Sequence, residues 1–473
     1  MKQSLWIGGK FRSTPTYMEL QNPYDLEPIA QIAVAERDDV YAAIAAAQEA
    51  KDLMAEMPAH QRAVILEKVA GFLKEEREAC ARLISQEAAK PLKAARAEVE
   101  RTILTYTFAA HEARRIHGET VPMDAAPGGE GRLAFTIREP LGVIAAITPF
   151  NFPMNLVAHK VGPAIAAGNT VILKPASQTP LSAYKMAEFF HKAGLPAGAL
   201  NVVTGSGRMI GDILMKDEQI KMITFTGSPE VGQYIREQSG LKRVTLELGS
   251  NSAVIVDEGV NLEKVIPRIV NGAFAYQGQV CISVQRVFVH EKILARFVEQ
   301  FVVEAKKLKS GNPLDESTDI SALITRQDVE RTKTWVEEAV AAGAALSLGG
   351  DFSEGIFQPT VLVDVPTTAK VSCEEIFAPV VHINCFKTFE EAIQLVNQSK
   401  YGLQAGIFTN DIHRGLQAAK KLEVGGVMIN EIPTFRVDQM PYGGVKLSGM
   451  GREGIKYAVE EMTELKLISF KME

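Results

Sequence analysis

A cysteine, Cys281, lies in a loop of small and polar residues, Gly278-Gln279-Val280-Cys281-Ile282-Ser283. The loop joins a helical pattern at 265–276 to a strand pattern at 284–290. A nucleophilic thiol needs exposure, room for a substrate, and neighbouring donors that lower its pKa or hold an oxyanion. A junction of helix, loop and strand offers all three. Cysteine is also a common buried apolar residue, and the loop by itself slightly favours that structural interpretation.

Two further side chains that could take part in catalysis lie at or just after the ends of predicted strands. Glu247 lies between two leucines, and a carboxylate among apolar neighbours has a raised pKa that suits a general base near neutral pH. Asn151 follows Thr148-Pro149-Phe150, and its amide can donate to an oxyanion. The ordinary interpretations stay open for each alone: a strand-edge glutamate that faces water, and an asparagine that shapes a turn or caps a helix.

The elements that must position these residues alternate along the chain. Continuous apolar runs at 143–147, 170–174, 200–203, 222–225 and 243–248 are separated by helical patterns at 156–167, 181–193, 209–215 and 229–237. Such alternation predicts a parallel sheet covered on both faces, with ligands at the carboxyl ends of the strands. The residues that directly follow the strands are Asn151, Lys174, Ser177, Gly205, Thr226, Gly227, Ser228 and Gly249.

The rest of the chain predicts three other regions. Short strands and turns are expected at 1–36, and three or four amphipathic helices at 38–115. A second α/β unit begins near residue 251, with strands at 253–256, 284–290 and 380–386, helices at 262–276, 294–309, 329–341 and 390–398, and a polar loop at 370–379. Strand patterns at 115–140 and 464–472 stand apart, and the 115–140 hairpin pairs either with another chain or within its own.

Composition excludes several classes of protein. The 473 residues are 46% hydrophobic and 23% charged, which predicts two or three domains with a large core. A net charge of −6 argues against nucleic acid as a partner. Four scattered cysteines without a CxxC pair argue against a disulfide framework and structural zinc, and they suit the cytoplasm. No apolar run approaches the roughly 20 residues of a membrane helix, so we expect a soluble protein.

Two glycine-containing turns bear on a cofactor. The turn from Gly205 to Gly211 has the spacing GxGxxxG, one residue longer than the dinucleotide fingerprint, and no acidic residue follows at the expected distance. An ordinary strand–helix turn is the better interpretation of it. In Thr226-Gly227-Ser228-Pro229 the proline suits a first helical turn, whose free N–H groups can bind an anion. Together the two turns favour a nucleotide cofactor.

Seven segments in a fixed order resemble the aldehyde dehydrogenase superfamily, and the resemblance covers essentially the whole chain. The segments are Pro149-Phe150-Asn151-Phe152-Pro153, Gly168-Asn169-Thr170-Val171-Ile172-Leu173-Lys174-Pro175, Phe225-Thr226-Gly227-Ser228, Leu246-Glu247-Leu248-Gly249, Gly278-Gln279-Val280-Cys281, Glu374-Glu375-Ile376-Phe377-Ala378-Pro379 and Pro441-Tyr442-Gly443-Gly444-Val445-Lys446. The resemblance implies an α/β fold with a Rossmann-type cofactor domain (1–116 and 141–249), a second α/β catalytic domain (250–449) and a small β arm for oligomerisation (117–140 and 460–473). A homodimer or homotetramer is expected.

The resemblance also implies a mechanism. Cys281 attacks an aldehyde to give a thiohemiacetal, whose oxyanion is held by Asn151 and the backbone N–H of Cys281. Hydride passes to NAD or NADP, and Glu247 activates the water that hydrolyses the resulting thioester. Lys160 matches a lysine near the active site. The residues expected at the cofactor are Thr148, Pro149, Phe150, Lys174, Ser177, Gly207, Gly211, Phe225, Thr226, Gly227, Ser228, Gly249, Glu375 and Phe377; among them Lys174 matches the residue at the adenosine ribose and Glu375 the acid at the nicotinamide ribose.

Three positions depart from the family pattern. Ser177 stands where many NAD-preferring members have a glutamate, so NADP should be tolerated while NAD remains possible. Ser250 replaces a common glycine, with an effect that the sequence does not specify. Ala378 also replaces a glycine, and we expect no consequence.

One segment lies in the region that shapes the substrate tunnel of the family: Thr434-Phe435-Arg436-Val437-Asp438-Gln439-Met440. It resembles the same segment in family members that act on short polar aldehydes, such as lactaldehyde-like, phosphorylated or sulfonated three-carbon aldehydes. Arg436 and Arg101 are the candidate anchors for an anionic tail, because a guanidinium binds carboxylate, phosphate or sulfonate. A structural salt bridge is about equally expected for both. The alternatives are a CoA-acylating semialdehyde dehydrogenase, which Glu247 disfavours, and a non-enzymatic relative, which the intact reactive residues disfavour. No metal is expected.

Overall fold

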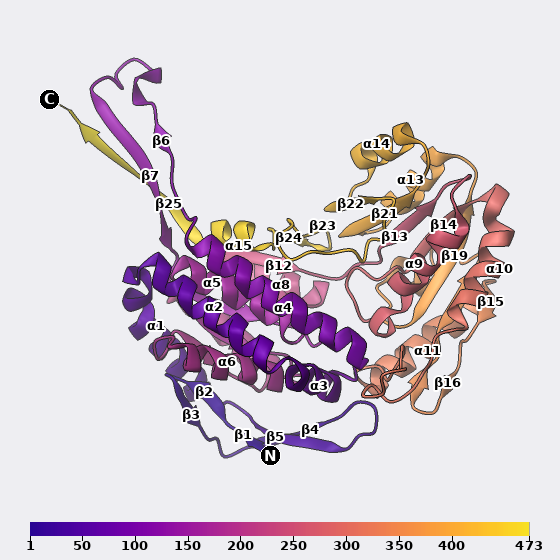
Figure 1. The fold of residues 1–473 in the computed structure, drawn as a ribbon, viewed down its shortest axis with the longest axis horizontal. Helices are drawn as coiled ribbons and strands as arrows, with labels where there is room; N and C mark the ends of the chain where they lie inside the picture. The colour runs from indigo at the N-terminus through magenta and orange to yellow at the C-terminus, as the bar shows by residue number, and fades with distance from the viewer. Residues whose placement is uncertain (473) are drawn as a thin grey trace.

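A computed structural model describes residues 1–472, in which two large β-sheets lie side by side and a narrow arm projects from the body (Figure 1). The first sheet has the strand order β24-β12-β11-β8-β9-β10-β2-β3. Its five strands from β12 to β10 run parallel, as predicted from the continuous apolar runs. The bounds of its strands are β2 (Leu5–Ile7), β3 (Lys10–Arg12), β8 (Val143–Ile147), β9 (Thr170–Lys174), β10 (Leu200–Val202), β11 (Ile220–Thr226), β12 (Arg243–Glu247) and β24 (Gly449–Met450).

Helices cover both faces of this sheet. In β8, Ile144 and Ala146 enter one apolar cluster while Val143 and Ala145 enter another. Successive side chains of a strand point to opposite faces, so a continuous apolar run requires cover on both sides. The helices of this part of the chain are α1 (Arg37–Glu56), α2 (Ala59–Glu75), α3 (Arg77–Ala88), α4 (Leu92–Ala113), α5 (Asn155–Ala167), α6 (Leu181–Ala193), α7 (Gly207–Lys216), α8 (Pro229–Gln238) and α15 (Ile455–Glu461).

The second sheet has the order β15-β18-β19-β14-β13-β21-β22 and is parallel except for β15. Its strands are β13 (Ala253–Val256), β14 (Arg286–His290), β15 (Ala345–Leu348), β18 (Thr360–Val363), β19 (Val380–Phe386), β21 (Gln404–Phe408) and β22 (Gly426–Ile429). Its helices are α9 (Leu262–Phe274), α10 (Leu294–Ala305), α11 (Arg326–Ala341), α13 (Phe389–Asn397) and α14 (Ile412–Lys421). The predicted second α/β unit is therefore present.

The arm is a three-stranded antiparallel sheet of order β25-β7-β6, seen at the upper left of Figure 1. Its strands are β6 (Thr120–Val121), β7 (Arg132–Pro140) and β25 (Thr463–Lys471). Strand β25 pairs with β7 along its whole length, from Thr463 opposite Pro140 to Lys471 opposite Arg132. The terminal strand thus finds its partner within its own chain.

Several predicted boundaries were wrong. The expected polar loop at 370–379 contains the short helix α12 (Lys370–Cys373). Helix α9 ends at Phe274 because Tyr276 and Gln277 adopt left-handed φ values of 50° and 53°. The elements β15 to β18, α14 and β20 to β24 were not predicted, although β18 and β21 are interior strands of the second sheet. The short elements among them are β16 (Phe352–Ser353), β17 (Ile356–Phe357), β20 (Tyr401–Gly402) and β23 (Val445–Lys446). The division into domains stays a prediction.

The N-terminal residues also form a small sheet of order β1-β5-β4. Its strands are β1 (Lys2–Gln3), β4 (Tyr17–Gln21) and β5 (Pro28–Ala33). Within residues 1–472, no helix has the length and apolarity needed to cross a bilayer.

Candidate active site

The Cys281 loop leaves α9 through a tight, left-handed bend. Gly278 continues the bend with a φ of 71°, and a Cβ there would come within 2.2 Å of the Ala378 carbonyl oxygen. Glycine is required at this position because a side chain would collide with the neighbouring backbone. The Gln279 side chain accepts a hydrogen bond from Ile324 N at 3.0 Å, which fixes the loop. The loop is therefore held rigidly beside the 376–379 segment.

The thiol of Cys281 is partly exposed and has a hydroxyl neighbour. Its Sγ lies 2.8 Å from the Tyr442 hydroxyl oxygen. Removal from water raises the pKa of the Cys281 thiol to about 11, whereas the Tyr442 hydrogen bond and the Arg436 charge lower it. The Tyr442 hydroxyl and the Arg436 guanidinium are therefore the neighbours that favour the thiolate form of Cys281.

Asn151 lies beside the same loop, as predicted. It follows β8, and its Nδ2 donates to the Gln279 carbonyl oxygen at 3.0 Å. Its Oδ1 has no hydrogen-bond partner within residues 1–472. This contact places a side-chain amide next to the residues that lead into Cys281, where an oxyanion would form.

Glu247 ends β12 in a buried position. Its side chain has 3% exposure, and neither carboxylate oxygen has a hydrogen-bond partner in the described part of the chain. Burial, reinforced by the Glu453 carboxylate, raises the pKa of Glu247 well above its usual value. A Cβ on Gly443 would lie 2.9 Å from Glu247 Oε1, so only glycine leaves room for this carboxylate. These properties suit a general base.

A network of buried charges stands next to Glu247. Lys160 Nζ lies 2.9 Å from one oxygen of Glu453, and Arg436 lies 3.0 Å from the other. His159 Nε2 lies 2.8 Å from Asp438, and Arg101 lies 2.7 Å from the same carboxylate oxygen. Lys160 therefore stands at the site, as predicted, and each candidate anchor already has a carboxylate partner.

The two candidate anchors, Arg436 and Arg101, differ in their exposure to solvent and in their aromatic neighbours. Arg436 has 6% side-chain exposure, and its Nε has no partner within residues 1–472. Its guanidinium carbon lies 3.7 Å from the centre of the Tyr442 ring. Arg101 is more exposed, at 27%, and lies 5.7 Å from the centre of the Phe152 ring. Phe152 and Cys281 both pack against one apolar cluster, so Arg101 lies over a neighbour of that cluster, whereas the Arg436 charge acts on the thiol itself.

A cavity of about 830 Å³ opens at the carboxyl ends of β8, β9 and β11. Most of the residues predicted at the cofactor line it, namely Thr148, Pro149, Lys174, Ser177, Gly207, Gly211, Phe225, Thr226, Gly227 and Ser228. Arg208 and Glu230, which were not predicted, line it as well. The position agrees with the rule for open parallel sheets.

The cavity fits a dinucleotide. Two helices begin at it, α7 after Ser206 and α8 after Ser228, and each serine caps its helix through the side-chain oxygen. Their N-termini offer free N–H groups to a pyrophosphate. Thr226 Oγ1 is buried and has no partner among the described residues. Burial lowers the pKa of Lys174.

The other residues predicted at the cofactor lie outside the lining of this cavity: Phe150, Gly249, Glu375 and Phe377. Glu375 accepts a hydrogen bond from Ser250 N at 2.9 Å, and burial raises the pKa of Glu375 to about 7. A Cβ on Gly249 would come within 2.7 Å of this carboxylate. The rings of Phe150 and Phe377 meet edge to face at 5.8 Å between centres. Ser250 therefore supports Glu375 through its backbone.

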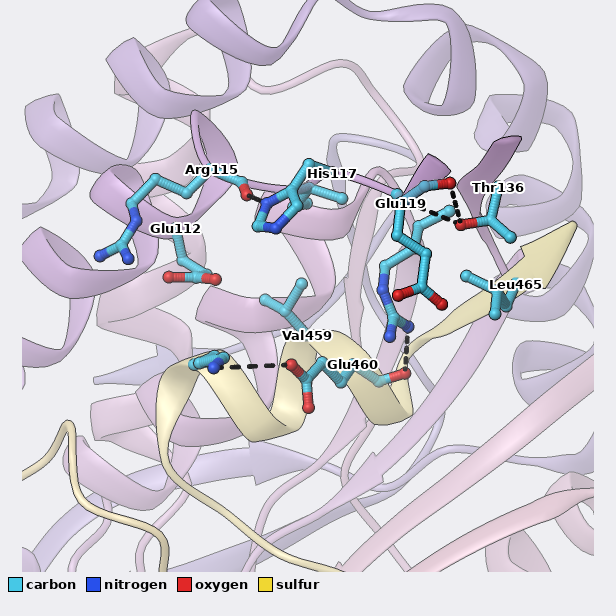
Figure 2. Close-up of a pocket in the computed structure, with 12 residues that line it drawn as sticks. Glu112, Arg115, His117, Glu119, Thr136, Val459, Glu460 and Leu465 are labelled. Carbon is cyan, nitrogen blue, oxygen red and sulfur yellow. Dashed lines mark hydrogen bonds and ion pairs between the residues drawn. The ribbon is translucent and has the colours of Figure 1, made fainter. Parts of the chain in front are cut away.

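Another hollow lies at the root of the arm, between α4, α15 and the arm strands, and Figure 2 shows its lining. Its volume is about 240 Å³. Arg115, Arg138 and Lys456 alternate with Glu112, Glu119 and Glu460 around it, so charge favours neither an anion nor a cation. None of the predicted site residues lines this hollow. In residues 1–472, no group of three or more His, Cys, Asp or Glu side chains is placed to hold a metal ion.

Comparisons with known proteins agree with this geometry. Residues 11–468 match the model of the aldehyde dehydrogenase family. The chain is 48% identical over 464 residues to a 3-sulfolactaldehyde dehydrogenase of Priestia aryabhattai, covering 98% of this chain and 97% of that one. It is 43% identical over 455 residues to a lactaldehyde dehydrogenase of Methanococcus vannielii, covering 95% and 96%.

Two solved structures resemble this chain over nearly their whole length. Aldehyde dehydrogenase 21 of Physcomitrella patens, in complex with the reaction product succinate, superposes with a TM-score of 0.97 at 41% identity, covering 99% of this chain and 98% of that one. A glyceraldehyde-3-phosphate dehydrogenase of Methanocaldococcus jannaschii, complexed with NADP, gives 0.93 at 42% identity, covering 97% and 99%. The chain belongs to the aldehyde dehydrogenase family. The predicted fold and the enzyme class, an NAD(P)-dependent aldehyde dehydrogenase, are thereby confirmed.

Four side chains of the site were not assigned a role from the sequence: Tyr442, Glu453, His159 and Asp438. Tyr442 and Asp438 lie in segments that were singled out, but nothing in those segments specified a contact. These contacts could not be predicted because the partners are far apart in the sequence: Tyr442 is 161 positions from Cys281, and Asp438 is 279 positions from His159.

Proposed function

We propose that this enzyme oxidises a short aldehyde with an anionic tail to the carboxylic acid. The observation that carries the proposal is the Arg436 guanidinium, which lies on the ring of Tyr442 beside Cys281, together with Arg101, which lies over Phe152 against the same apolar cluster. A guanidinium pairs well with carboxylate, phosphate or sulfonate. Two of the relatives are named for anionic aldehydes, 3-sulfolactaldehyde and glyceraldehyde-3-phosphate, and the structure of aldehyde dehydrogenase 21 holds the dianion succinate. The lactaldehyde dehydrogenase is named for a neutral aldehyde of the same length.

The residues of this chain divide the chemistry among them. Cys281 attacks the aldehyde carbon, and Asn151 donates to the oxygen that becomes negative. NAD or NADP held in the cavity lined by Lys174, Thr226 and Ser228 would supply the hydride acceptor. Glu247 then takes a proton from the water that hydrolyses the thioester. Lys160 and Arg436 keep the neighbouring Glu453 ionised, and burial together with this negative charge raises the pKa of Glu247.

The lining of the cavity supports use of NADP as well as NAD. Ser177 carries no charge that would repel a 2′-phosphate, and Lys174 and Arg208 line the same cavity. A lysine and an arginine favour a phosphate group, whereas Glu230 opposes it. We propose that NADP is accepted, with Lys174 at the adenosine ribose and Glu375 at the nicotinamide ribose.

The arm supports an oligomer. Leu133, Phe135, Ile468 and Phe470 share one face of it, and we call this set the apolar arm face. Leu133 and Phe470 are 49% and 52% exposed. Exposed apolar surface of this kind marks an interface, so we propose a homodimer or homotetramer built through the arm. A cytoplasmic location suits the four free cysteines, because a reactive thiol requires a reducing compartment.

The test compares two aldehydes of equal carbon number, succinic semialdehyde and butanal, with Arg101→Ala and Arg436→Ala. Arg101→Ala should lower kcat/KM for succinic semialdehyde about tenfold or more and leave butanal nearly unchanged, because only the carboxylate loses a partner. Arg436→Ala should slow both substrates, and the anionic one more.

The matched control is Arg414→Ala. Arg414 pairs with the buried Asp257 at 2.6 Å, much as Arg101 pairs with Asp438, but it lies in another part of the molecule. The control should leave both substrates unaffected. Equal losses for the two aldehydes in both site variants would contradict an anionic substrate.

A further inference from the structure

Tyr442 touches the proposed nucleophile and is held firmly. Its hydroxyl lies 2.8 Å from Cys281 Sγ, and the residue has 3% exposure. Its backbone exchanges two hydrogen bonds with Glu453, of 3.0 and 2.7 Å. The ring packs with Tyr276, Val280 and Ile282, so the hydroxyl has little freedom to turn away from the sulfur.

The chemistry of the pair gives the hydrogen bond a direction. Burial, then the Cys281 charge, raises the pKa of Tyr442 well above its usual value, so the phenol keeps its proton. A thiolate carries no proton and can only accept. The Arg436 guanidinium lies 3.7 Å from the ring centre, where a cation draws electron density from the ring and makes the O–H a better donor.

We propose that Tyr442 is a catalytic residue: its O–H donates to the Cys281 thiolate and, with Arg436 on its ring, stabilises the ionised form of the nucleophile. The proposal rests on Cys281 being the nucleophile of the proposed function. A tyrosine that only fills space would need its ring and not its hydroxyl. The pH at which Cys281 becomes reactive separates these two roles.

Other charged groups also face the thiol. Arg436 favours the thiolate, whereas Glu375 and Glu247 oppose it. Because these two carboxylates also titrate, they affect any measurement of Cys281 reactivity against pH. The role of Tyr442 is therefore judged from the difference between the midpoints of the wild-type and variant enzymes, and not from one midpoint alone.

The experiment measures alkylation of Cys281 by iodoacetamide against pH, without aldehyde or cofactor, by mass spectrometry of the Cys281 peptide. Alkylation forms a carbon–sulfur bond and releases iodide, and only the thiolate reacts. In Tyr442→Phe the midpoint should rise by about one pH unit or more, and the rate at neutral pH should fall about tenfold, because a hydrogen bond to a charged group is lost. An unchanged midpoint would overturn the proposal.

Tyr184→Phe is the matched control. Tyr184 is also buried, and its hydroxyl bonds to Thr204 instead of a reactive group, so its removal should leave the midpoint in place. A control that moves the midpoint as far as Tyr442→Phe does would overturn the assignment to Tyr442.

A second measurement covers the case in which Tyr442→Phe does not fold. Introduction of 3-fluorotyrosine at position 442 keeps the ring and makes the O–H a stronger donor, so the midpoint should fall; no fall would count against the proposal. Failure of the proposed function is distinguishable, because it would appear as aldehyde turnover retained in Cys281→Ala. The alkylation profile does not depend on turnover.

Discussion

At the scale of single residues, Glu247 and Glu453 show how one buried carboxylate tunes another. Glu453 has two cationic partners, Lys160 and Arg436, which outweigh its burial and lower its pKa. Glu247 has no hydrogen-bond partner within residues 1–472, and its pKa is raised by burial and by Glu453. Neighbouring groups whose pKa values are driven apart are typical of acid–base sites.

This difference predicts the pH dependence of thioester hydrolysis. Because the pKa of Glu247 is raised, its carboxylate forms only as the pH climbs through that raised value, and hydrolysis should increase with pH over the same interval. Glu247→Gln should remove this dependence and lower kcat about 100-fold or more while a first-turnover burst of reduced cofactor remains. Stopped-flow absorbance measures both. Glu464→Gln, on the exposed arm, is the control, and a Glu247→Gln enzyme of normal kcat would refute the role.

Ser177 permits a test of cofactor choice. Ser177→Glu adds a carboxylate to the cavity and should lower kcat/KM with NADP about tenfold relative to NAD, because like charges next to a 2′-phosphate repel. Gln178→Glu adds the same charge to the neighbouring cavity residue and serves as the control. An unchanged ratio of the two cofactors in Ser177→Glu would show that position 177 does not face the ribose.

Cys281, Glu247 and Asn151 could be predicted because each lies in a segment typical of the family. The carboxylate partners of the candidate anchors Arg436 and Arg101 could not be predicted from the sequence. Arg436 was predicted as an anchor, but its pairing with Glu453 depends on how the chain folds back after residue 440. A side chain's partner is decided by tertiary packing, which the local sequence does not encode.

At the scale of elements, helix α5 is the most constrained part of the site. The Glu98 carboxylate accepts hydrogen bonds from Met154 N and Asn155 N, at 2.9 and 3.2 Å, and so fixes the start of the helix that carries His159 and Lys160. Glu98 and its partner Lys90 form a fully buried ion pair. Removal of one partner from such a pair leaves an uncompensated buried charge.

Lys90→Met should therefore lower the free energy of unfolding by about 3–5 kcal/mol, because Glu98 is left buried and unpaired. The double variant Lys90→Met with Glu98→Gln should recover part of this loss, since the amide oxygen still accepts from the helix and no charge remains. The urea midpoint measures both. If the double variant were no more stable than the single one, uncompensated charge would not be the cause.

The continuous apolar strands of the first sheet were predictable, whereas the shortest strands were not, nor were the interior strands β18 and β21 of the second sheet. A parallel strand covered on both faces must be apolar throughout, and this signal is visible at 143–147 and 170–174. Strands β20, β23 and β24 have two residues each and pair antiparallel. Such short strands form only because the rest of the molecule brings them to an edge.

At the scale of the whole molecule, the arm extends away from the body (Figure 1), and Leu133 and Phe470 of the apolar arm face are about half exposed. If the proposed oligomer forms through this face, Phe470→Lys should give a smaller species, because a charge would be buried in the interface. Light scattering after size exclusion measures the mass. Ser469→Lys adds the same charge to the opposite face of the same strand and is the control. An unchanged mass in Phe470→Lys would exclude this face as the contact.

The chain returns to the first sheet only at β24, near its end. During synthesis, the parts of the site that depend on this return can therefore form only after most of the chain has been made. The lining of the nucleotide cavity lies between Ile147 and Ile235, so a nascent chain can complete it early. Arg436, Tyr442, Glu453 and the strand that covers Glu247 emerge more than 200 residues later. Contacts so distant in sequence form late in folding. A ribosome-bound chain therefore acquires the capacity to hold a nucleotide well before it acquires a competent nucleophile.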